Sequence, residues 1–154
     1  MKGIKIEPEI DLQIDLNVTS YIPDEYIQDA NQKIEIYQKI ALCKNEKDIQ
    51  NIIDEIIDRF GNMPKELENL IAIARIKYLA KSLNVSKIVS KLKNRTTTVV
   101  FTFEQNQFQL DLNELVKKYG NKIKFSAGIK PMVTLELGSN SEQQILNDIT
   151  KFLS

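Results

Sequence analysis

Three charged residues, Glu55, Asp58 and Arg59, lie close together in the stretch IIDEIIDRFGNMP, residues 52–64. If this stretch is helical, a turn of about 100° per residue places its isoleucines on one side and these three residues largely on the other. Glu55 and Arg59 are four positions apart with the acid first, an order in which an ion pair contributes about 0.2–0.5 kcal/mol. Asp58 would stand in the last turn, where the helix dipole disfavours an acid. The three residues are therefore either a solvated helix face or a polar contact surface.

Histidine, the residue that catalytic sites use most often as a general base, is missing from this chain. Among its 154 residues there is no histidine and one cysteine, Cys43, which excludes His-assisted nucleophiles, a His general base and most zinc sites. Neither GxGxxG nor GxxxxGK[ST] occurs. Carboxylates are numerous, so an acid-based hydrolase stays open as an interpretation, although no pattern favours it. We therefore expect a binding or regulatory role, with no catalytic residue, no cofactor and no metal in this chain.

Hydrophobic spacing predicts a mostly helical first half. Apolar residues at every second position predict a strand or extended arm over residues 9–18, after which Pro23 turns the chain. Apolar spacings of three and four predict helices over residues 29–42, 46–60 and 64–83. Gly61 is expected to end the second of these helices in the left-handed αL conformation, and Pro64 to lie in the first turn of the third.

From about residue 85 the hydrophobic period changes from 3.6 to 2, which predicts a sheet with two helices, in the order β-β-(β)-α-β-β-α. The predicted strands cover residues 85–92, 96–103, 106–111, 122–127 and 132–137, and the predicted helices cover 111–120 and 139–153. The last helix has two candidate capping boxes, one beginning at Ser139 and one at Ser141. The expected fold class is α/β (α+β), a helical N-terminal half packed with a mixed-sheet C-terminal half. We expect one domain over residues 1–154, with a helical part at about 20–84 and a sheet part at about 85–154.

Charge is distributed unevenly along the chain, although the formal net charge is zero. Residues 1–70 carry a net charge of −7 and residues 71–154 a net charge of +7, and such asymmetry can steer a charged partner. Within residues 71–95 there are seven basic residues and no acid. This segment is either a helix face followed by a lysine-protected strand edge, or a surface for nucleic acid or an acidic partner. Because one tyrosine is its sole aromatic residue, we favour the first interpretation.

No apolar run is long enough to cross a membrane, and the N-terminus lacks the apolar core of a signal peptide. We expect a cytoplasmic protein or a segment of one.

Several ordered motifs between residues 9 and 76 resemble one protein family. They read EIDLQIDL, then YIPDEYIQDA, then DEIIDRFGNMP and NLIAIARI. They are similar to the C-terminal domain of the bacterial transcription-repair coupling factors (Mfd), which show an EIDL-type strand, a YIP-x-x-YI-x-D turn, E-L-x-D-R-F-G-x-x-P and N-L-x-x-x-A-R. The resemblance covers nearly half of the chain, and beyond about residue 84 it extends to the architecture alone.

The resemblance implies that the chain is one segment of a large protein. Other parts of such a protein form an ATP-driven translocase on double-stranded DNA, which uses ATP and Mg, and a module that binds RNA polymerase. The full-length protein acts on RNA polymerase stalled at a lesion and recruits the repair protein UvrA through a UvrB-like N-terminal module.

The resemblance also implies a role for this segment itself, which is not enzymatic. It would pack against the UvrB-like module, hide the UvrA-binding surface and restrain the translocase until polymerase is engaged. Glu55, Asp58 and Arg59 are then expected to contact the UvrB-like module. The alternative is an accessory module that binds nucleic acid through residues 71–95.

Overall fold

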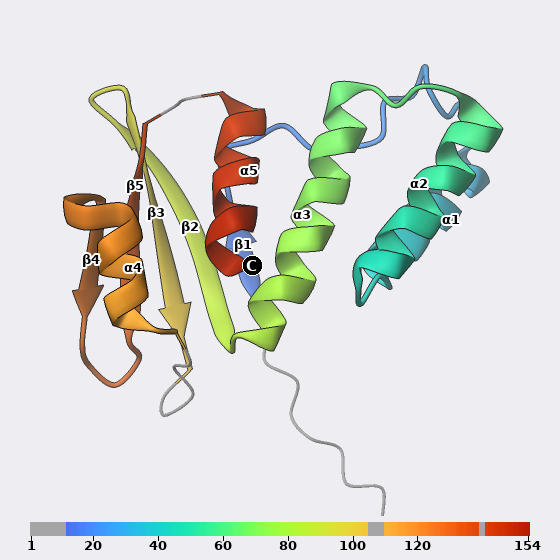
Figure 1. Ribbon diagram of the computed structural model, residues 1–154. Coiled ribbons are helices and arrows are strands. Elements are labelled where there is room, and N and C mark those ends of the chain that lie inside the picture. The colour runs from blue at the N-terminus through green and yellow to red at the C-terminus, as the bar shows by residue number, and fades with distance from the viewer. Residues whose placement is uncertain (1–11, 105–109, 139–140) are drawn as a thin grey trace, which may run out of the picture.

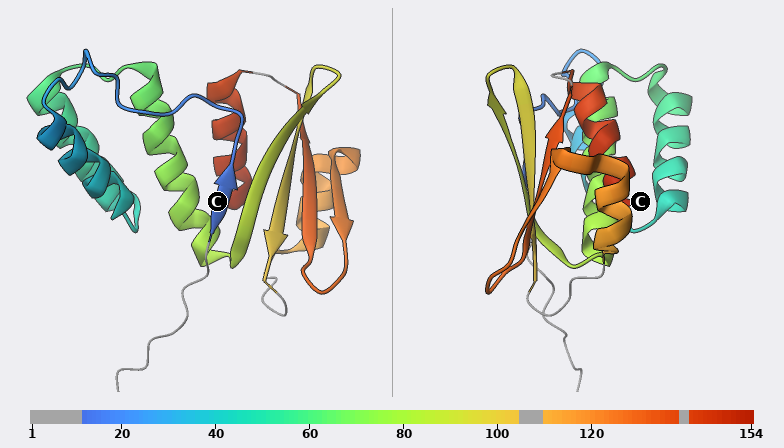
Figure 2. Two further views of the ribbon diagram at one scale, coloured as in Figure 1. Left: turned by 180° about the vertical axis from the view of Figure 1, so that it is seen from behind. Right: turned by 60° about the vertical axis from the view of Figure 1, so that its left-hand side comes forward.

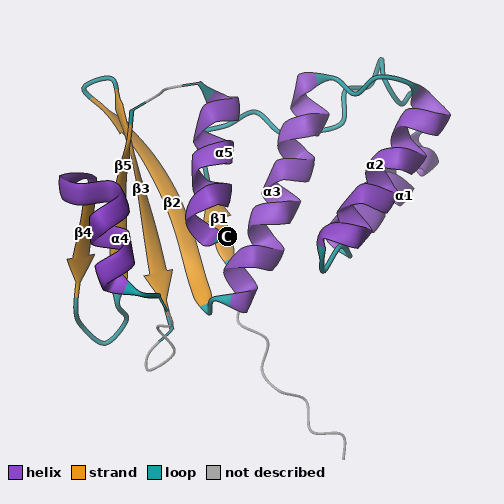
Figure 3. Cartoon of the chain, viewed as in Figure 1, coloured by secondary structure: helices purple, strands orange, loops and turns teal. Residues whose placement is uncertain are grey.

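The computed structural model describes residues 12–104, 110–138 and 141–154. Three helices form the first part of the molecule: α1 (Ala30–Ala41), α2 (Glu46–Phe60) and α3 (Lys65–Ser82) (Figure 1). The second part is a sheet with two further helices (Figure 3). Its elements are β1 (Gln13–Asp15), β2 (Val85–Lys93), β3 (Thr96–Phe103), α4 (Leu112–Tyr119), a 3-10 turn (Gly120–Lys122), β4 (Ile123–Ser126), β5 (Met132–Leu137) and α5 (Glu142–Leu153).

The sheet has five strands in the order β1-β2-β3-β5-β4. β1 runs parallel to β2, with Ile14 opposite Ile88, and the other neighbouring strands are antiparallel. Because the chain leaves β1, forms α1, α2 and α3, and returns as the parallel strand β2, the whole helical part is the connection between two adjacent strands. Figure 2 shows α3, α4 and α5 on the same face of the sheet.

The molecule has two hydrophobic clusters, one in each part, and α3 contributes residues to both. The first lies between the sheet and α5, where the rings of Phe101 and Phe152 stack with their centroids 4.5 Å apart. The second lies among the three N-terminal helices and is made largely of isoleucines. Ile76 of α3 is buried in the first cluster and Leu67 in the second, so the apolar residues on more than one face of α3 are explained by two packing partners.

The predicted fold class is confirmed: a helical half is followed by a mixed sheet with helices. The helix expected over residues 46–60 and the strands expected over 96–103 and 132–137 have the same bounds in the structure. Within the described residues, no helix is both long and apolar enough to cross a membrane.

One predicted strand is not found in the part of the chain where it can be tested. Residues 105–109, which include most of the strand expected over 106–111, lie outside the described ranges. Asp111 is the N-cap of α4 instead, and its Oδ1 accepts hydrogen bonds from the backbone N–H groups of Asn113 and Glu114. A capping side chain at this position satisfies helix donors that would otherwise be unpaired, which explains why the helix begins here.

The expected details at two other helix ends are also wrong. Gly61 ends α2 with φ 90° and ψ −162°, a conformation that is nearly restricted to glycine but differs from αL in ψ. The N-cap of α5 is Ser141, which rules out the capping box that would begin at Ser139, a residue outside the described ranges. The Ser141 side chain makes no capping hydrogen bond, so the second candidate box does not form either.

Candidate interaction surface on helix α2

Helix α2 is fixed on its inner side by burial and at both ends by hydrogen bonds. Ile49, Ile52 and Ile56 are buried against the neighbouring helices. The Asn45 side chain caps the N-terminus by accepting the backbone N–H of Asp48 at 2.8 Å. At the other end the Tyr26 hydroxyl donates to the carbonyl oxygen of Gly61 at 2.6 Å. The remaining side of α2, which carries Glu55, Asp58 and Arg59, is therefore presented outward on a well-fixed helix.

An ion-pair network joins this outer side of α2 to α1. The Lys39 Nζ lies 2.8 Å from the Glu55 carboxylate and 3.1 Å from the Glu35 carboxylate. The Arg59 Nη1 lies 2.8 Å from Glu55 and 3.4 Å from Glu35. Two cations and two acids thus alternate across the interface between the two helices.

The network keeps its members charged. The Lys39 ammonium and then the Arg59 guanidinium, both hydrogen-bonded to Glu55, hold the pKa of the Glu55 carboxyl below its ordinary value, against the opposing effect of partial burial. In return, the hydrogen bonds to Glu55 raise the pKa of Lys39 and of Arg59. At neutral pH all three groups are ionised, so the surface presents a fixed pattern of charge.

Asp58 stands apart from this network. Among the described residues it forms no ion pair, and its side chain is exposed. With Asp54, Glu55 and Ile57 it lines a hollow of about 610 Å³, beside which Ile57 is 44% exposed. The structure therefore brings Glu55 and Arg59 together and leaves Asp58 as an uncompensated acid one turn along the same side.

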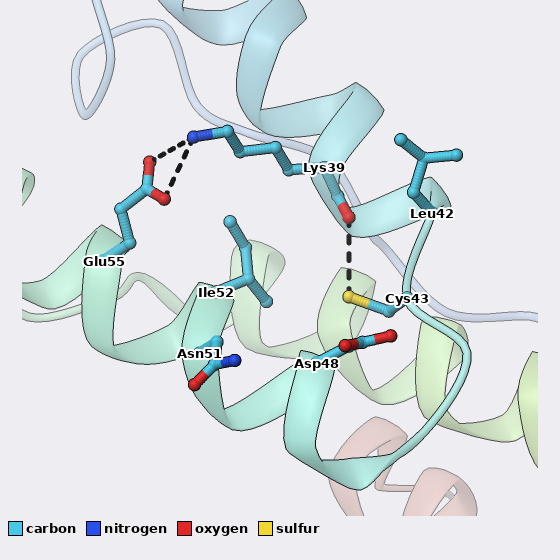
Figure 4. A pocket seen from close by; sticks show the side chains of 7 residues that line it. All are labelled: Lys39, Leu42, Cys43, Asp48, Asn51, Ile52 and Glu55. Carbon is cyan, nitrogen blue, oxygen red and sulfur yellow. Dashed lines mark hydrogen bonds and ion pairs between the residues drawn. The ribbon is translucent and has the colours of Figure 1, made fainter.

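A second groove, of about 300 Å³, lies between α1 and α2 and is lined by residues of both (Figure 4). In Figure 4 the Lys39 side chain reaches from α1 to the Glu55 carboxylate of α2. The Cys43 Sγ donates to the carbonyl oxygen of Lys39 at 3.4 Å, and burial, followed by the charge of Asp48, raises the pKa of this thiol. A raised pKa keeps the thiol protonated, so Cys43 has none of the activation that a nucleophilic cysteine requires.

No metal centre is found in the described ranges, because nowhere in them do three His, Cys, Asp or Glu side chains converge.

The basic segment 71–95 does not form one continuous surface. Its first three bases lie on α3, which packs on the helical face of the sheet. Lys87 and Lys91 alternate with the buried Ile88 on β2 and so point from the opposite face. Arg75 is already neutralised, because its guanidinium donates to Glu46 at 2.8 and 2.9 Å. The structure thus supplies no observation in favour of the nucleic-acid interpretation of the whole segment.

Four residues of this candidate site, two on α1 and two on α2, were not identified by the sequence analysis. Lys39 and Glu35 complete the network, and Asp54 and Ile57 line the hollow. The four-residue spacing of Glu35 and Lys39 is visible in the sequence, but Lys39 meets Glu55 only because α1 packs against α2. No pattern in the neighbouring sequence of either residue predicts that contact.

Comparisons with known proteins agree with each other. The family model described as the TRCF domain matches residues 16–120. The transcription-repair-coupling factor of Bacillus subtilis is 31% identical over 156 aligned residues, which cover 99% of this chain and 13% of that protein. The transcription-repair-coupling factor of Rickettsia prowazekii is 30% identical over 141 residues, which cover 91% of this chain and 12% of that protein. The chain thus spans about an eighth of the length of these relatives.

A similar fold is found in a solved structure, the crystal structure of the C-terminal domain of a transcription-repair coupling factor. The TM-score is 0.74, the sequence identity is 23%, and the superposed region covers 92% of this chain and 89% of that one.

Proposed function

The chain belongs to the TRCF domain family, and from this premise we propose that it is a non-catalytic, autoinhibitory interaction domain of a transcription-repair coupling factor. The domain packs on a UvrB-like N-terminal module of the same protein and masks the surface that binds UvrA. In this closed state the domain restrains an ATP-driven translocase that moves on double-stranded DNA and uses ATP and Mg. The restraint lasts until stalled RNA polymerase is engaged. All of this takes place in the cytoplasm.

The observation that carries this proposal is the outer side of α2. It combines an uncompensated acid, Asp58, with a half-exposed isoleucine, Ile57, around one hollow. An apolar anchor beside a free charge is the composition expected of a small protein contact. Exposed ion pairs are individually weak and are screened by salt, which suits a contact that has to open during function.

The three residues have different parts in this contact. Asp58 offers its carboxylate to a cation of the UvrB-like module without first losing a partner of its own among the described residues. Arg59 uses Nη1 for its ion pairs and lies over the Phe60 ring, 5.0 Å from the centroid, which orients the other guanidinium donors. Glu55 is held by Lys39 and Arg59 and fixes the position of both relative to Asp58.

A tethered binding experiment tests the contact. The chain is joined by a flexible linker to a separately produced UvrB-like module of its parent protein, and a donor and an acceptor dye report whether the two are in contact. Linking raises the effective concentration to about the millimolar range, so a weak contact still forms. Asp58→Lys should lower the fraction in contact, while Glu136→Lys, an equal charge change at an exposed position on β5, should leave it unchanged.

The proposal fails if the two parts are not in contact at low salt, or if Asp58→Lys and Glu136→Lys have the same effect. Asp58→Lys is preferred to Glu55→Lys because reversing Glu55 would also break the network that joins α1 to α2.

A further inference from the structure

A cavity of about 360 Å³ lies between the α1–α2 connection and the C-terminal half of α3. Its lining residues are Ala41, Leu42, Cys43, Lys44, Lys77, Tyr78 and Lys81. Three of these seven are lysines and none is acidic. No residue is shared with the hollow beside Asp58, so this cavity is separate from the proposed contact surface.

The positive charge of the cavity is only partly balanced by neighbouring residues. Within the described ranges, Lys44, Lys77 and Lys81 form no ion pair. Of the nearby carboxylates, Glu46 is paired with Arg75 and also accepts the Tyr78 hydroxyl, whereas Asp48, among the described residues, accepts only the neutral backbone N–H of Lys44 and so keeps its negative charge beside the cavity.

The placement of two of the lysines on α3 adds to the repulsion. Lys77 and Lys81 are one turn apart on this helix, a spacing at which like charges destabilise a helix unless a counter-charge is present. The cavity lining therefore brings together three cationic groups and includes no acid.

Helix ends account for part of this charge but not for all of it. α1 ends at Ala41 and α3 at Ser82, and the last carbonyl groups of each helix carry a partial negative charge of about half a unit. Lys44 and Lys81 lie beside these ends and complement them. Lys77 stands more than a full turn before the end of α3, where the effect of the dipole has faded. When the charge of Asp48 and of the two helix ends is counted, about one unit of positive charge remains, which favours an anionic ligand such as a phosphate monoester.

The rest of the wall is apolar or aromatic. The Tyr78 hydroxyl donates to the Glu46 carboxylate at 2.7 Å, which holds the ring in place. Leu42 is 70% exposed and so offers an apolar surface at the mouth of the cavity. A ligand that fills this space needs an anionic group for the lysines and a flat or apolar group for Tyr78 and Leu42.

We propose that this cavity binds a phosphate monoester with a flat or apolar organic group, the class to which mononucleotides belong. The ammonium groups of Lys44, Lys77 and Lys81 take the phosphate oxygens, a role in which lysine acts as a point charge. The organic group packs between Leu42 and the Tyr78 ring. This site is independent of the contact that α2 makes with another module.

Titration calorimetry with the 154-residue chain tests the proposal, using AMP and inorganic phosphate as probes at low salt. The two probes carry nearly the same phosphoryl charge, so a difference between them reports the organic group. AMP should bind at least about fivefold more tightly than inorganic phosphate, because it alone reaches Leu42 and Tyr78. Lys77→Gln should weaken AMP binding by about tenfold, as expected for the loss of one charge-assisted contact. Leu42→Ser should reduce the preference for AMP over phosphate.

A matched control is Lys93→Gln, which removes the same charge from the exposed end of β2 and should leave AMP binding unchanged. Lys81→Gln, at an exposed position, serves as a second variant if Lys77→Gln lowers the melting temperature. The proposal is overturned if AMP shows no binding up to about 10 mM, a weak affinity by general standards. It is equally overturned if AMP and phosphate bind alike, or if Lys93→Gln weakens binding as much as Lys77→Gln. A short DNA duplex that binds more tightly than AMP, with a steep salt dependence, would also overturn it, because the ligand would then lie along an extended surface.

Discussion

Replacing Glu46 with glutamine should destabilise the protein by about 1 kcal/mol at neutral pH and should have almost no effect near pH 2. Glu46 lies in the first turn of α2, and its carboxylate accepts two hydrogen bonds from Arg75 of α3, at 2.9 and 2.8 Å. It also accepts the Tyr78 hydroxyl at 2.7 Å. These contacts join two helices that are separated by a turn in the sequence, so their loss should be seen in global unfolding.

The magnitude follows from the pKa of Glu46. The Arg75 hydrogen bonds, helped by Tyr78 and Gln50 and opposed by partial burial, lower this pKa from 4.5 to about 2. At about 1.4 kcal/mol per pH unit, that shift would correspond to roughly 3 kcal/mol if the group were shielded from water. The Glu46 side chain is 50% exposed, and solvent screening reduces the contribution to about 1 kcal/mol.

The pH dependence has a definite sign. Because the pKa in the folded state lies below that in the unfolded state, the contribution is fully present above about pH 4.5. It is lost progressively as the pH falls from there through about 2, since the carboxyl is fully protonated in both states only below its folded-state pKa.

Urea unfolding of the wild type, Glu46→Gln and Glu66→Gln, at pH 7 and at pH 2.5, measures this effect. Glu66 stands in the first turn of α3 but forms no ion pair among the described residues, so Glu66→Gln controls for the helix dipole alone. The excess destabilisation of Glu46→Gln should be about 1 kcal/mol at pH 7 and should fall to roughly a quarter of that at pH 2.5. A double-mutant cycle of Glu46→Gln with Arg75→Gln should give an interaction free energy of the same size between the two side chains. An excess that is absent at pH 7, or that is equal at both pH values, would refute the reasoning.

Two further substitutions test backbone strain and a partly buried hydrogen bond. Gly61→Ala should lower the free energy of unfolding by about 1–3 kcal/mol, measured by urea unfolding, because Gly61 has φ 90° although a Cβ would meet no atom within 4 Å. No destabilisation would show that the C-terminus of α2 adjusts without strain. Tyr37→Phe should cost about 1–3 kcal/mol, because the Tyr37 hydroxyl accepts the N–H of the buried Ile22 at 2.8 Å. Tyr21→Phe, at a residue that is 45% exposed, should change the melting temperature little, and equal shifts for the two tyrosines would contradict this account.

Much of the fold could be predicted because its local signals agree with its packing. Ile49, Ile52 and Ile56 repeat at helical spacing, and all three are buried. The alternation of Leu12, Ile14 and Leu16 with exposed polar residues likewise predicts β1. The parallel pairing of β1 with β2 could not be predicted, because Ile14 and Ile88 are brought together only by the helical part that separates them in the sequence.

The candidate site could be predicted in part for the same reason. The pairing of Glu55 with Arg59 follows from their spacing on one helix. The contact of Glu55 with Lys39 does not, since it depends on how two helices pack. Residue type alone is also insufficient: Tyr21 is about half exposed, whereas the Tyr37 hydroxyl accepts the backbone N–H of the buried Ile22, and nothing in their local sequence distinguishes the two tyrosines.

The affinity for UvrA of the full-length parent protein tests the central claim most directly. If the domain hides the UvrA-binding surface, UvrA can bind only after the closed contact has opened, and the free energy of opening lowers the measured affinity for UvrA. A substitution that breaks the closed contact should therefore restore the intrinsic affinity. Asp58→Lys in the full-length protein should therefore tighten UvrA binding by about 5–150-fold, the range of typical coupling energies, while Glu136→Lys should leave it unchanged. An Asp58→Lys protein that is folded and binds UvrA with the wild-type affinity would contradict the proposed autoinhibitory function.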